Sequence, residues 1–290
     1  MSLPIPSKTV FITGCSSGIG RAAARLFQRN GWNVVATMRN PADGADLKKL
    51  DDVTVLALDV NDQASIDAAL QTALERHGHI DLLVNNAGYA LMGAFENATE
   101  EQIQRQFDTN VFGLMRVTRA FLPHFRQRKA GMIINVASMA GRLPIPFMSV
   151  YNGSKWAVQG FTECLTYELA PFNIQVKIVE PGAVDTAFFG RSGDRDNGRG
   201  ISAYDALMDE QFPVLDKTGP GGSTSEDAAE VIYRAATDGK GTLRYRVGKD
   251  AKVLLSARKV LPDEVFLPMI RWSLSPQVFS RFGRMFYKAD

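Results

Sequence analysis

Short apolar runs rich in β-branched residues alternate with longer segments of helical periodicity along most of this chain. Apolar runs of this length are typical of strands that are buried on both faces, as they are in a parallel sheet. Strict alternation of the two patterns predicts βαβ units, and therefore an α/β fold with a doubly wound parallel sheet between two layers of helices (α/β/α). The expected strands are residues 9–13, 33–37, 53–58, 81–85, 132–136 and 174–179, and the expected helices are residues 19–30, 63–77, 99–128, 151–169 and 225–238.

The alternation continues from residue 8 to about residue 247 without a linker rich in Gly, Ser or Pro, so residues 1–247 are predicted to form a single domain. Within it, residues 186–224 are rich in Gly, Arg, Asp and Ser, a composition that predicts a mobile surface loop able to cover a substrate. Residues 248–290 carry spaced aromatic residues. They are predicted to form a C-terminal extension of helices that packs on the same domain or on a partner subunit.

The charge balance argues against two classes of partner. The chain of 290 residues has 33 basic and 31 acidic side chains and a net charge of +2. Such a balance gives no electrostatic reason to expect nucleic acid or an anionic membrane as the main partner. The three histidines do not have the spacing of metal ligands, so no metal site is predicted.

The N-terminus and the cysteines bear on location. The first seven residues lack the charged start and apolar stretch of a signal peptide, and no apolar run approaches the roughly 18 residues of a membrane span. Cys15 and Cys164 are best interpreted as reduced thiols. We therefore predict a cytoplasmic protein. Membrane association through the basic and aromatic tail is the weaker alternative to a solvated helix face.

The sequence Thr13-Gly-Cys-Ser-Ser-Gly-Ile-Gly20 follows the first expected strand and opens the first expected helix. Gly14 permits the tight turn, Gly18 lets the backbone approach a pyrophosphate, and Gly20 lets helix and strand pack closely. The helix N-terminus adds amide groups and a partial positive charge for the anion. This loop therefore predicts a dinucleotide-binding, Rossmann-type fold. Its expected cofactor contacts are Gly14, Ser16, Ser17, Gly18, Ile19 and Gly20.

The end of the second strand distinguishes the two nicotinamide cofactors. An acidic residue there would bind the ribose hydroxyls of NAD(H) and repel a 2′-phosphate. This chain has Met38 and Arg39 instead, and a guanidinium group suits a phosphate by its charge and its forked donors. We therefore predict that NADP(H) is preferred over NAD(H), with Ser16 as a further donor, unless Arg39 is only a solvated surface residue. Asp59, followed by Val60, is a candidate partner of the adenine amino group or, equally, a helix N-terminal acid.

Tyr151 and Lys155 are four residues apart at the start of an expected helix and so share one face. A free tyrosine has a pKa of about 10 and is a poor proton shuttle near neutrality. We expect the Lys155 cation, together with an oxidised nicotinamide, to lower the pKa of Tyr151 by stabilising the phenolate. This pair alone is common by chance. It gains weight from Ser138, which stands thirteen residues before Tyr151 at the carboxyl end of an expected strand.

Four marked sequences follow four different expected strands: the glycine loop, Asn85-Asn-Ala-Gly88, Ser138 and Pro181-Gly182. In an open parallel sheet, ligands bind beyond the carboxyl ends of the strands. Because these ends meet at one edge of the sheet, we expect the four sequences to line one site. Packing alone gives no reason for this agreement.

Taken together, these motifs resemble those of the single-domain, NAD(P)-dependent branch of the short-chain dehydrogenase/reductase family, over roughly residues 8–247. The resemblance implies that Tyr151 donates the proton, that Ser138 holds the carbonyl oxygen, and that Lys155 binds the nicotinamide ribose and tunes Tyr151. It also implies that Asn110 keeps a water in the proton relay. The further cofactor contacts that it implies are Asn86, Ala87 and Gly88 on the adenosine side, Pro181 and Gly182, and Val184 and Thr186 at the nicotinamide carboxamide.

We therefore predict an enzyme that interconverts a small-molecule ketone or aldehyde and its alcohol by hydride transfer, with Tyr151 as general acid and base. Two alternatives stay open: a catalytically silent NADP(H)-binding sensor or regulatory module, and an isomerase or epimerase that holds its cofactor tightly. The resemblance also implies a homo-oligomer, a dimer or tetramer, that pairs through helices 99–128 and 151–169. Apolar residues near the catalytic ones favour a bulky apolar substrate. They are Leu143, Pro144, Phe147, Met148, Phe188 and Phe189.

Overall fold

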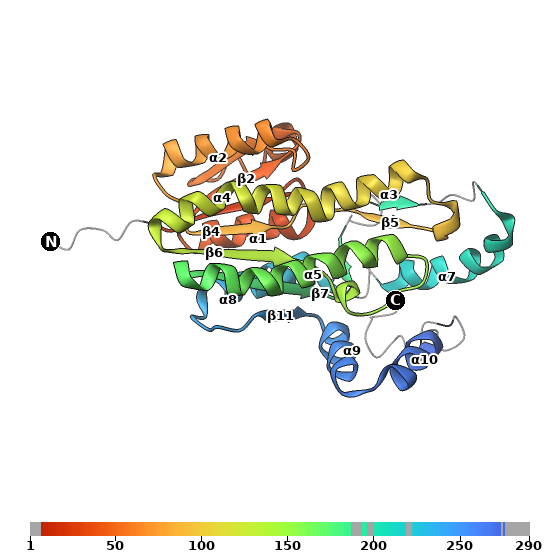
Figure 1. Cartoon of the computed structure of the whole chain (residues 1–290). Helices are drawn as coiled ribbons and strands as arrows, with labels where there is room; N and C mark the ends of the chain where they lie inside the picture. Colours follow the sequence, from red (N-terminus) through yellow and green to blue (C-terminus); the bar gives the residue numbers. More distant parts are fainter. Residues whose placement is uncertain (1–6, 187–192, 196–199, 219–221, 274, 276–290) are drawn as a thin grey trace.

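The computed structural model describes residues 7–186, 193–195, 200–218, 222–273 and 275. Its centre is a sheet in which all neighbouring strands are parallel, in the order β11–β7–β6–β4–β1–β2–β3 (Figure 1). The strand order reverses direction on either side of β1, so the predicted doubly wound sheet is confirmed. The strands are β1 (Thr9–Thr13), β2 (Asn33–Met38), β3 (Val53–Ala57), β4 (Leu82–Asn85), β6 (Gly131–Val136), β7 (Ile174–Pro181) and β11 (Arg244–Val247).

Strand β11 was not among the expected strands. Its sequence, Arg-Tyr-Arg-Val, alternates charged and apolar residues and so lacks the continuous apolar run of the other strands. It pairs only with β7 and forms an edge of the described sheet. Tyr245 and Val247 are buried, whereas Arg244 and Arg246 are partly exposed. This alternation is what an edge strand with one solvated face requires.

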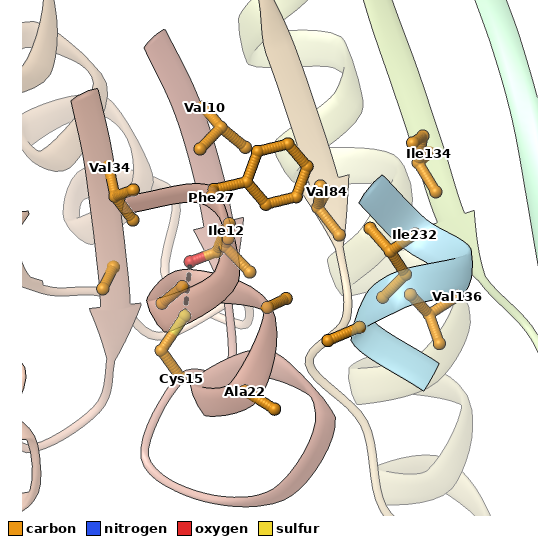
Figure 2. Close-up of a cluster of buried hydrophobic side chains, with 14 of the residues drawn as sticks. Val10, Ile12, Cys15, Ala22, Phe27, Val34, Val84, Ile134, Val136 and Ile232 are labelled. Carbon is orange, nitrogen blue, oxygen red and sulfur yellow. Dashed lines mark hydrogen bonds between the residues drawn. The ribbon is translucent and has the colours of Figure 1, made fainter. Parts of the chain in front are cut away.

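Helices cover both faces of the sheet, which confirms the three layers (Figure 1). On one face, Val10 and Ile12 of β1 pack against Phe27 of α1 and Ile232 of α8 (Figure 2). Cys15 belongs to the same cluster, and its thiol donates a 3.4 Å hydrogen bond to the carbonyl oxygen of Ile12. Burial raises the pKa of Cys15 to about 12, so this thiol is no nucleophile. The helices of this face are α1 (Gly18–Arg29) and α8 (Ser225–Thr237).

On the other face, Phe11 of β1 points away from Val10 and Ile12, as the alternation of side chains along a strand requires. Its ring meets that of Phe121 of α4 edge to face, with 4.9 Å between the ring centroids. Both rings are fully buried. The helices of this face are α2 (Gln63–His77), α4 (Leu114–Arg128) and α5 (Ser149–Leu169).

Residues 99–128 were predicted as one helix, but the structure divides them. Helix α3 (Glu100–Phe107) begins with a capping box at Thr99 and runs into a π-helical segment, Asp108–Gly113, before α4. A Cβ atom at Gly113 would lie 2.7 Å from the side chain of Val60, so the segment packs very closely there. The wider turn carries Asn110, and π-helical turns of this kind are frequent at functional sites.

Residues 186–224 were predicted as a loop, which is wrong for residues 205–218. They form helix α7 (Asp205–Thr218), with Met208 and Val214 buried. The sequence did not predict this helix, because Pro213 lies inside it and the neighbouring residues are rich in glycine and charged residues. Four short strands form two small sheets beside the main one. They are β5 (Ala90–Met92) with β9 (Gly193–Arg195), and β8 (Val184–Asp185) with β10 (Ser223–Thr224).

The C-terminal extension begins with α9 (Lys249–Val260) and α10 (Asp263–Ser273), which lie below the sheet in Figure 1. Leu255 and Phe266 of these helices are fully buried, and they form one cluster with Met139 and Leu143 of the same chain. The extension therefore packs directly behind the carboxyl end of β6. Among the described residues, no helix has the length and apolar character that crossing a membrane would require.

Candidate active site

A cavity of about 620 Å³ opens at the carboxyl ends of the sheet strands. That volume lies within the range of small-molecule and cofactor sites. The structure thus brings together the four strand ends that the sequence analysis singled out. The predicted site residues that line the cavity are Gly14, Ser16, Ser17, Gly18, Ile19, Arg39, Asp59, Val60, Asn86, Ala87, Gly88, Ser138, Tyr151, Lys155, Pro181, Gly182, Val184 and Thr186. Gly20 and Asn110 lie behind this lining.

The glycine loop is shaped by positive φ angles and by close backbone contacts. Gly14 and Gly18 have φ of 75° and 53°, in the left-handed region that favours glycine. A Cβ atom at Gly14 would lie 2.8 Å from the Cα atom of Ala87, and one at Gly20 would lie 2.4 Å from the carbonyl oxygen of Gly14. The role predicted for Gly20, close packing, therefore agrees with its position behind the cavity.

The start of α1 suits an anion. The side chain of its N-cap residue, Ser17, makes no capping hydrogen bond, and the first turn holds no acidic residue. The amide of Asn86 fixes the loop from the side of β4, because its Nδ2 atom donates to the carbonyl oxygens of Thr13 at 2.9 Å and Gly14 at 3.1 Å. A helix N-terminus held open in this way, beside a backbone cradle, fits the pyrophosphate of a dinucleotide.

Arg39 and Asp59 stand at the predicted adenosine end. Arg39 is exposed at the end of β2, and it lines the cavity. Asp59 accepts a 2.9 Å hydrogen bond from the amide of Asn61, whereas the N-cap of α2 is Asp62. Asp59 is therefore not the capping acid of that helix. Both side chains lie where a ligand in the cavity can reach them.

Ser138, Tyr151 and Lys155 are all buried and line one part of the cavity. Ser138 is the second residue after β6. Its hydroxyl caps the turn that follows by accepting a 3.1 Å hydrogen bond from the amide of Ala140. Tyr151 lies in the first turn of α5, and it shares a hydrogen bond with Ser138. Lys155 lies one turn further along the same helix, with its Nζ atom 5.8 Å from the centroid of the Tyr151 ring.

The pKa values of this pair differ from the prediction. Burial raises the pKa of Tyr151 to about 12, and the hydrogen bond with Ser138 only partly opposes it. Burial also lowers the pKa of Lys155 to about 8. The net shift of the Tyr151 pKa is therefore upward, because desolvation outweighs the hydrogen bond with Ser138, and the lowering expected from Lys155 together with an oxidised nicotinamide stays a prediction. The Lys155 ammonium group donates a 3.2 Å hydrogen bond to the carbonyl oxygen of Val136.

Asn110 lies directly behind Lys155 and Gly88 rather than in the cavity wall. Its Nδ2 atom donates to the carbonyl oxygen of Tyr89 at 2.9 Å and to Ser154 Oγ at 3.2 Å, and its Oδ1 atom accepts from the amide of Tyr89 at 3.0 Å. A Cβ atom at Gly88 would lie 3.0 Å from Asn110 Oδ1 and 3.7 Å from Lys155 Nζ. Asn110 thus fixes the backbone after β4 close to the Lys155 ammonium group.

The other end of the cavity, next to Ser138 and Tyr151, has both apolar and charged lining residues. Of the residues predicted for it, Met148 lines the cavity, but Leu143 is buried in the cluster with α9 and α10. Phe147 packs against Phe212 of α7, with 6.0 Å between the ring centroids. Pro144 is exposed and is not part of the lining, and Phe188 and Phe189 lie outside the described residues.

Several lining residues were missed, and those from α3, β9 and α7 come from segments that lie far from Ser138 and Tyr151 in sequence. Charged residues from α3, β9 and α7 also line this end of the cavity. Arg105 forms an ion pair with Asp194. Arg195 forms one with Asp216, in which Arg195 Nη1 lies 3.1 Å from Asp216 Oδ2. No pattern in the sequence links these charges. The apolar lining residues that were missed include Met92 and Leu215, and also Met139 and Ile145, which lie close to Ser138 and Tyr151 in sequence.

Residues 8–197 match the short chain dehydrogenase family. The chain belongs to this family. An uncharacterized oxidoreductase of Schizosaccharomyces pombe is 38% identical over 79% of this chain and 96% of its own. A 3-ketodihydrosphingosine reductase of Bacteroides thetaiotaomicron is 32% identical over 90% of this chain and 96% of its own. For retinol dehydrogenase 8 of Bos taurus, the identity is 33% over 88% and 86%. This family member is therefore an oxidoreductase.

Solved structures agree with the fold. A short-chain dehydrogenase from Streptomyces avermitilis is 34% identical, with a TM-score of 0.78, over 96% of this chain and 99% of that one. A 3-ketoacyl-(acyl-carrier-protein) reductase from Brucella melitensis, solved with NADH, is 28% identical, with a TM-score of 0.70, over 83% and 96%. A serine dehydrogenase solved with NADP⁺ is 30% identical, with a TM-score of 0.70, over 82% and 94%. Structural relatives of this short-chain dehydrogenase thus bind either form of the cofactor.

Proposed function

We propose that this short-chain dehydrogenase is an NADP(H)-dependent enzyme that interconverts a ketone or aldehyde and its alcohol, with Tyr151 as general acid and base. One observation carries the proposal. The hydrogen-bonded pair of Ser138 and Tyr151, with Lys155 one helical turn away, lies in the same cavity as the glycine loop at the start of α1. A site that only held a dinucleotide would need neither Ser138 nor Tyr151.

The reaction divides between the cofactor and the side chains. A bound nicotinamide dinucleotide supplies or accepts the hydride. In the reducing direction, the Ser138 hydroxyl holds the substrate oxygen, and the Tyr151 hydroxyl gives its proton to that oxygen as negative charge develops there. A pKa of about 12 keeps Tyr151 in its protonated form at neutral pH, ready to act as the acid. Lys155 keeps its cation close enough to favour the phenolate that remains.

The preference for NADP(H) rests on Arg39. This arginine follows β2 at the rim of the cavity, and neither Thr37 nor Met38 before it is acidic. A 2′-phosphate on the adenosine ribose would meet a forked cationic donor there. Ser16 of the glycine loop lines the same cavity and can add a hydroxyl.

The proposed substrate is bulky and apolar. Methionine side chains adapt to varied apolar shapes, and three of them line the end of the cavity next to Ser138 and Tyr151. The names of two relatives, a 3-ketodihydrosphingosine reductase and a retinol dehydrogenase, refer to large substrates of low polarity. The apolar lining residues at this end are Met92, Met139, Ile145, Met148 and Leu215.

We also propose that the protein works as a homo-oligomer, a dimer or tetramer, that pairs through the face of α4 and α5. Three large aromatic side chains are exposed on these elements: Phe112 by 44% in the segment that leads into α4, and Trp156 by 47% and Tyr167 by 82% on α5. Exposed aromatic residues on neighbouring helices are typical of the centre of a protein interface.

The test is consumption of NADPH and NADH with a panel of carbonyl compounds that ranges from aryl and long-chain ketones to small keto acids. Turnover of the apolar ketones with NADPH is expected. A systematic preference for small charged keto acids would contradict the substrate class. Tight NADPH binding without oxidation by any compound of the panel would favour the alternative, a catalytically silent NADP(H) sensor.

A further inference from the structure

Asp250 is a buried carboxylate at the start of the C-terminal extension, and its contacts reach the cavity. It lies in the first turn of α9 and is only 3% exposed. Its Oδ2 atom accepts a 2.7 Å hydrogen bond from the backbone amide of Ala183. Ala183 belongs to the loop Pro181–Val184, which continues β7 and lines the cavity.

Two glycines make room for this carboxylate. A Cβ atom at Gly182 would lie 2.2 Å from Asp250 Oδ1, and one at Gly248 would lie 2.4 Å from the same atom. Gly248 has a φ of 89°, which few other residues tolerate. Any side chain at either position would displace the carboxylate. The two glycines and Asp250 therefore form one closely fitted unit between β7 and α9.

The loop is held on both sides. The amide of Gly182 donates a 3.0 Å hydrogen bond to the carbonyl oxygen of Val247 in β11, and the carbonyl oxygen of Ala183 accepts one of 3.0 Å from the amide of Ser223 in β10. Asp250 adds the contact to the amide of Ala183 itself. A negative charge in the first turn of a helix is also favoured by the helix dipole. Helix α9 therefore stabilises the Asp250 carboxylate that binds the Ala183 amide.

The same helix supports the catalytic side of the cavity. Ala251 and Leu255, which follow Asp250 in α9, are fully buried against Met139 and Leu143, next to Ser138. One short helix of the extension therefore contacts the chain after β7 and the chain after β6. Both segments line the cavity, but α9 itself does not.

We infer that Asp250 is a positioning residue that fixes the Pro181–Val184 loop in the conformation that receives the nicotinamide end of the cofactor. The inference rests on the proposed function, because it takes this loop to lie at that end. Its carboxylate does not touch the cofactor. It acts through the Ala183 amide, and it gives the C-terminal extension a role in cofactor binding.

The test compares two ligands on the full-length protein. Asp250→Asn keeps the shape of the side chain but removes its charge, and Asp263→Asn is the matched control, because Asp263 is an exposed acid of the same extension. Dissociation constants are measured by calorimetry for NADPH and for 2′,5′-ADP, which lacks the nicotinamide half. If wild type prefers NADH, that cofactor and ADP replace them. These measurements need no turnover. The inference on Asp250 can therefore be wrong while the proposed reaction is right, and the proposed reaction can be wrong while the inference is right.

Asp250→Asn is expected to weaken NADPH binding about tenfold and to leave 2′,5′-ADP binding within twofold of wild type, while Asp263→Asn changes neither. Equal weakening of both ligands, or no change in either, would overturn the inference. Gly248→Ala gives a second route should Asp250→Asn not fold. Its Cβ atom displaces the carboxylate from outside the cavity. The same selective loss of NADPH binding is expected, and an unselective loss would again count against the role.

Discussion

The Nζ atom of Lys155 donates a 3.2 Å hydrogen bond to the carbonyl oxygen of Val136, the last residue of β6. This contact ties α5, which carries Tyr151, to the strand that leads to Ser138 two residues later. The three side chains of the proposed reaction therefore owe their arrangement to one strand and one helix. The cost is the burial of a lysine that is only 6% exposed.

That cost predicts a stability effect. The folded-state pKa of Lys155 is lowered from 10.5 to about 8, so below pH 8 the folded protein must bury a cation that the unfolded chain leaves in water. The protein is most stable in this respect above pH 10.5, where Lys155 is neutral in both the folded and the unfolded state. That stability is lost as the pH falls through about 8. At about 1.36 kcal/mol per pKa unit, the full effect is on the order of 3 kcal/mol. Lys155→Met should therefore raise the free energy of unfolding at pH 7 by about 1–3 kcal/mol, less than the full effect because the hydrogen bond to Val136 is also lost.

Urea unfolding of wild type and Lys155→Met between pH 7 and 10.5 measures this effect. The advantage of the variant is expected to shrink as the pH rises. Lys252→Met, which removes an exposed lysine of α9, is the control and should show no such trend. A variant that is less stable than wild type by the same amount at every pH would contradict the prediction.

The same pKa predicts a limit on activity. Since Lys155 loses its proton near pH 8, the cation that favours the Tyr151 phenolate disappears above that pH. The value of kcat/KM for carbonyl reduction should therefore fall about tenfold for each pH unit well above 8. Initial rates with NADPH between pH 6 and 10 test this, with enzyme stability checked at each pH. A flat profile up to pH 10 would show that the charge of Lys155 is not needed.

Arg39 predicts the cofactor preference. Arg39→Glu removes the proposed phosphate partner and adds a repelling charge, so kcat/KM with NADPH should fall by about 10- to 100-fold, in line with the ~1.5–3 kcal/mol of a charged hydrogen bond. The value with NADH should fall by no more than a factor of about two. Arg29→Glu, at the far end of α1, is the matched control. Equal losses with the two cofactors would remove Arg39 from the account of specificity.

Trp156 predicts the interface. Its side chain is 47% exposed on α5, and a carboxylate buried there in an oligomer would be strongly unfavourable. Trp156→Glu should therefore shift the mass found by light scattering to that of the single chain, 31.8 kDa. Val260→Glu replaces another exposed apolar residue, on α9, and should leave the mass of the oligomer unchanged. Wild-type protein that is already a single chain would contradict the proposed oligomer.

The sheet could be predicted because its inner strands are buried on both faces. Runs such as that at Leu82–Asn85 therefore carry a continuous apolar signal. Strand β11 has one solvated face, and its two arginines interrupt the apolar run by which the other strands were predicted. The division of residues 99–128 was missed for a different reason. A π-helical segment keeps the apolar spacing of a helix nearly unchanged, and its close packing at Gly113 involves Val60, about fifty residues earlier in the chain.

The part of the cavity lined by the glycine loop could be anticipated because its segments follow strand ends, where sequence order fixes position. The substrate end could not. Leu215 and the pair of Arg195 and Asp216 reach the cavity from segments whose course depends on tertiary packing. The pKa of Tyr151 also needed the structure, because spacing shows that Lys155 is near but not how deeply both groups are buried. The sequence did not indicate a role for Asp250, because that role follows only from its contact with the Ala183 amide.

The most direct test of the central claim is the turnover of NADPH by Tyr151→Phe with the best carbonyl substrate of wild type. This change removes one hydroxyl group, the proposed proton donor, and leaves the ring in its place. The account predicts a loss of kcat of about 10²- to 10⁴-fold, with the dissociation constant of NADPH within about twofold of wild type. A variant that keeps the wild-type kcat would show that Tyr151 does not transfer the proton, and it would contradict the proposed mechanism.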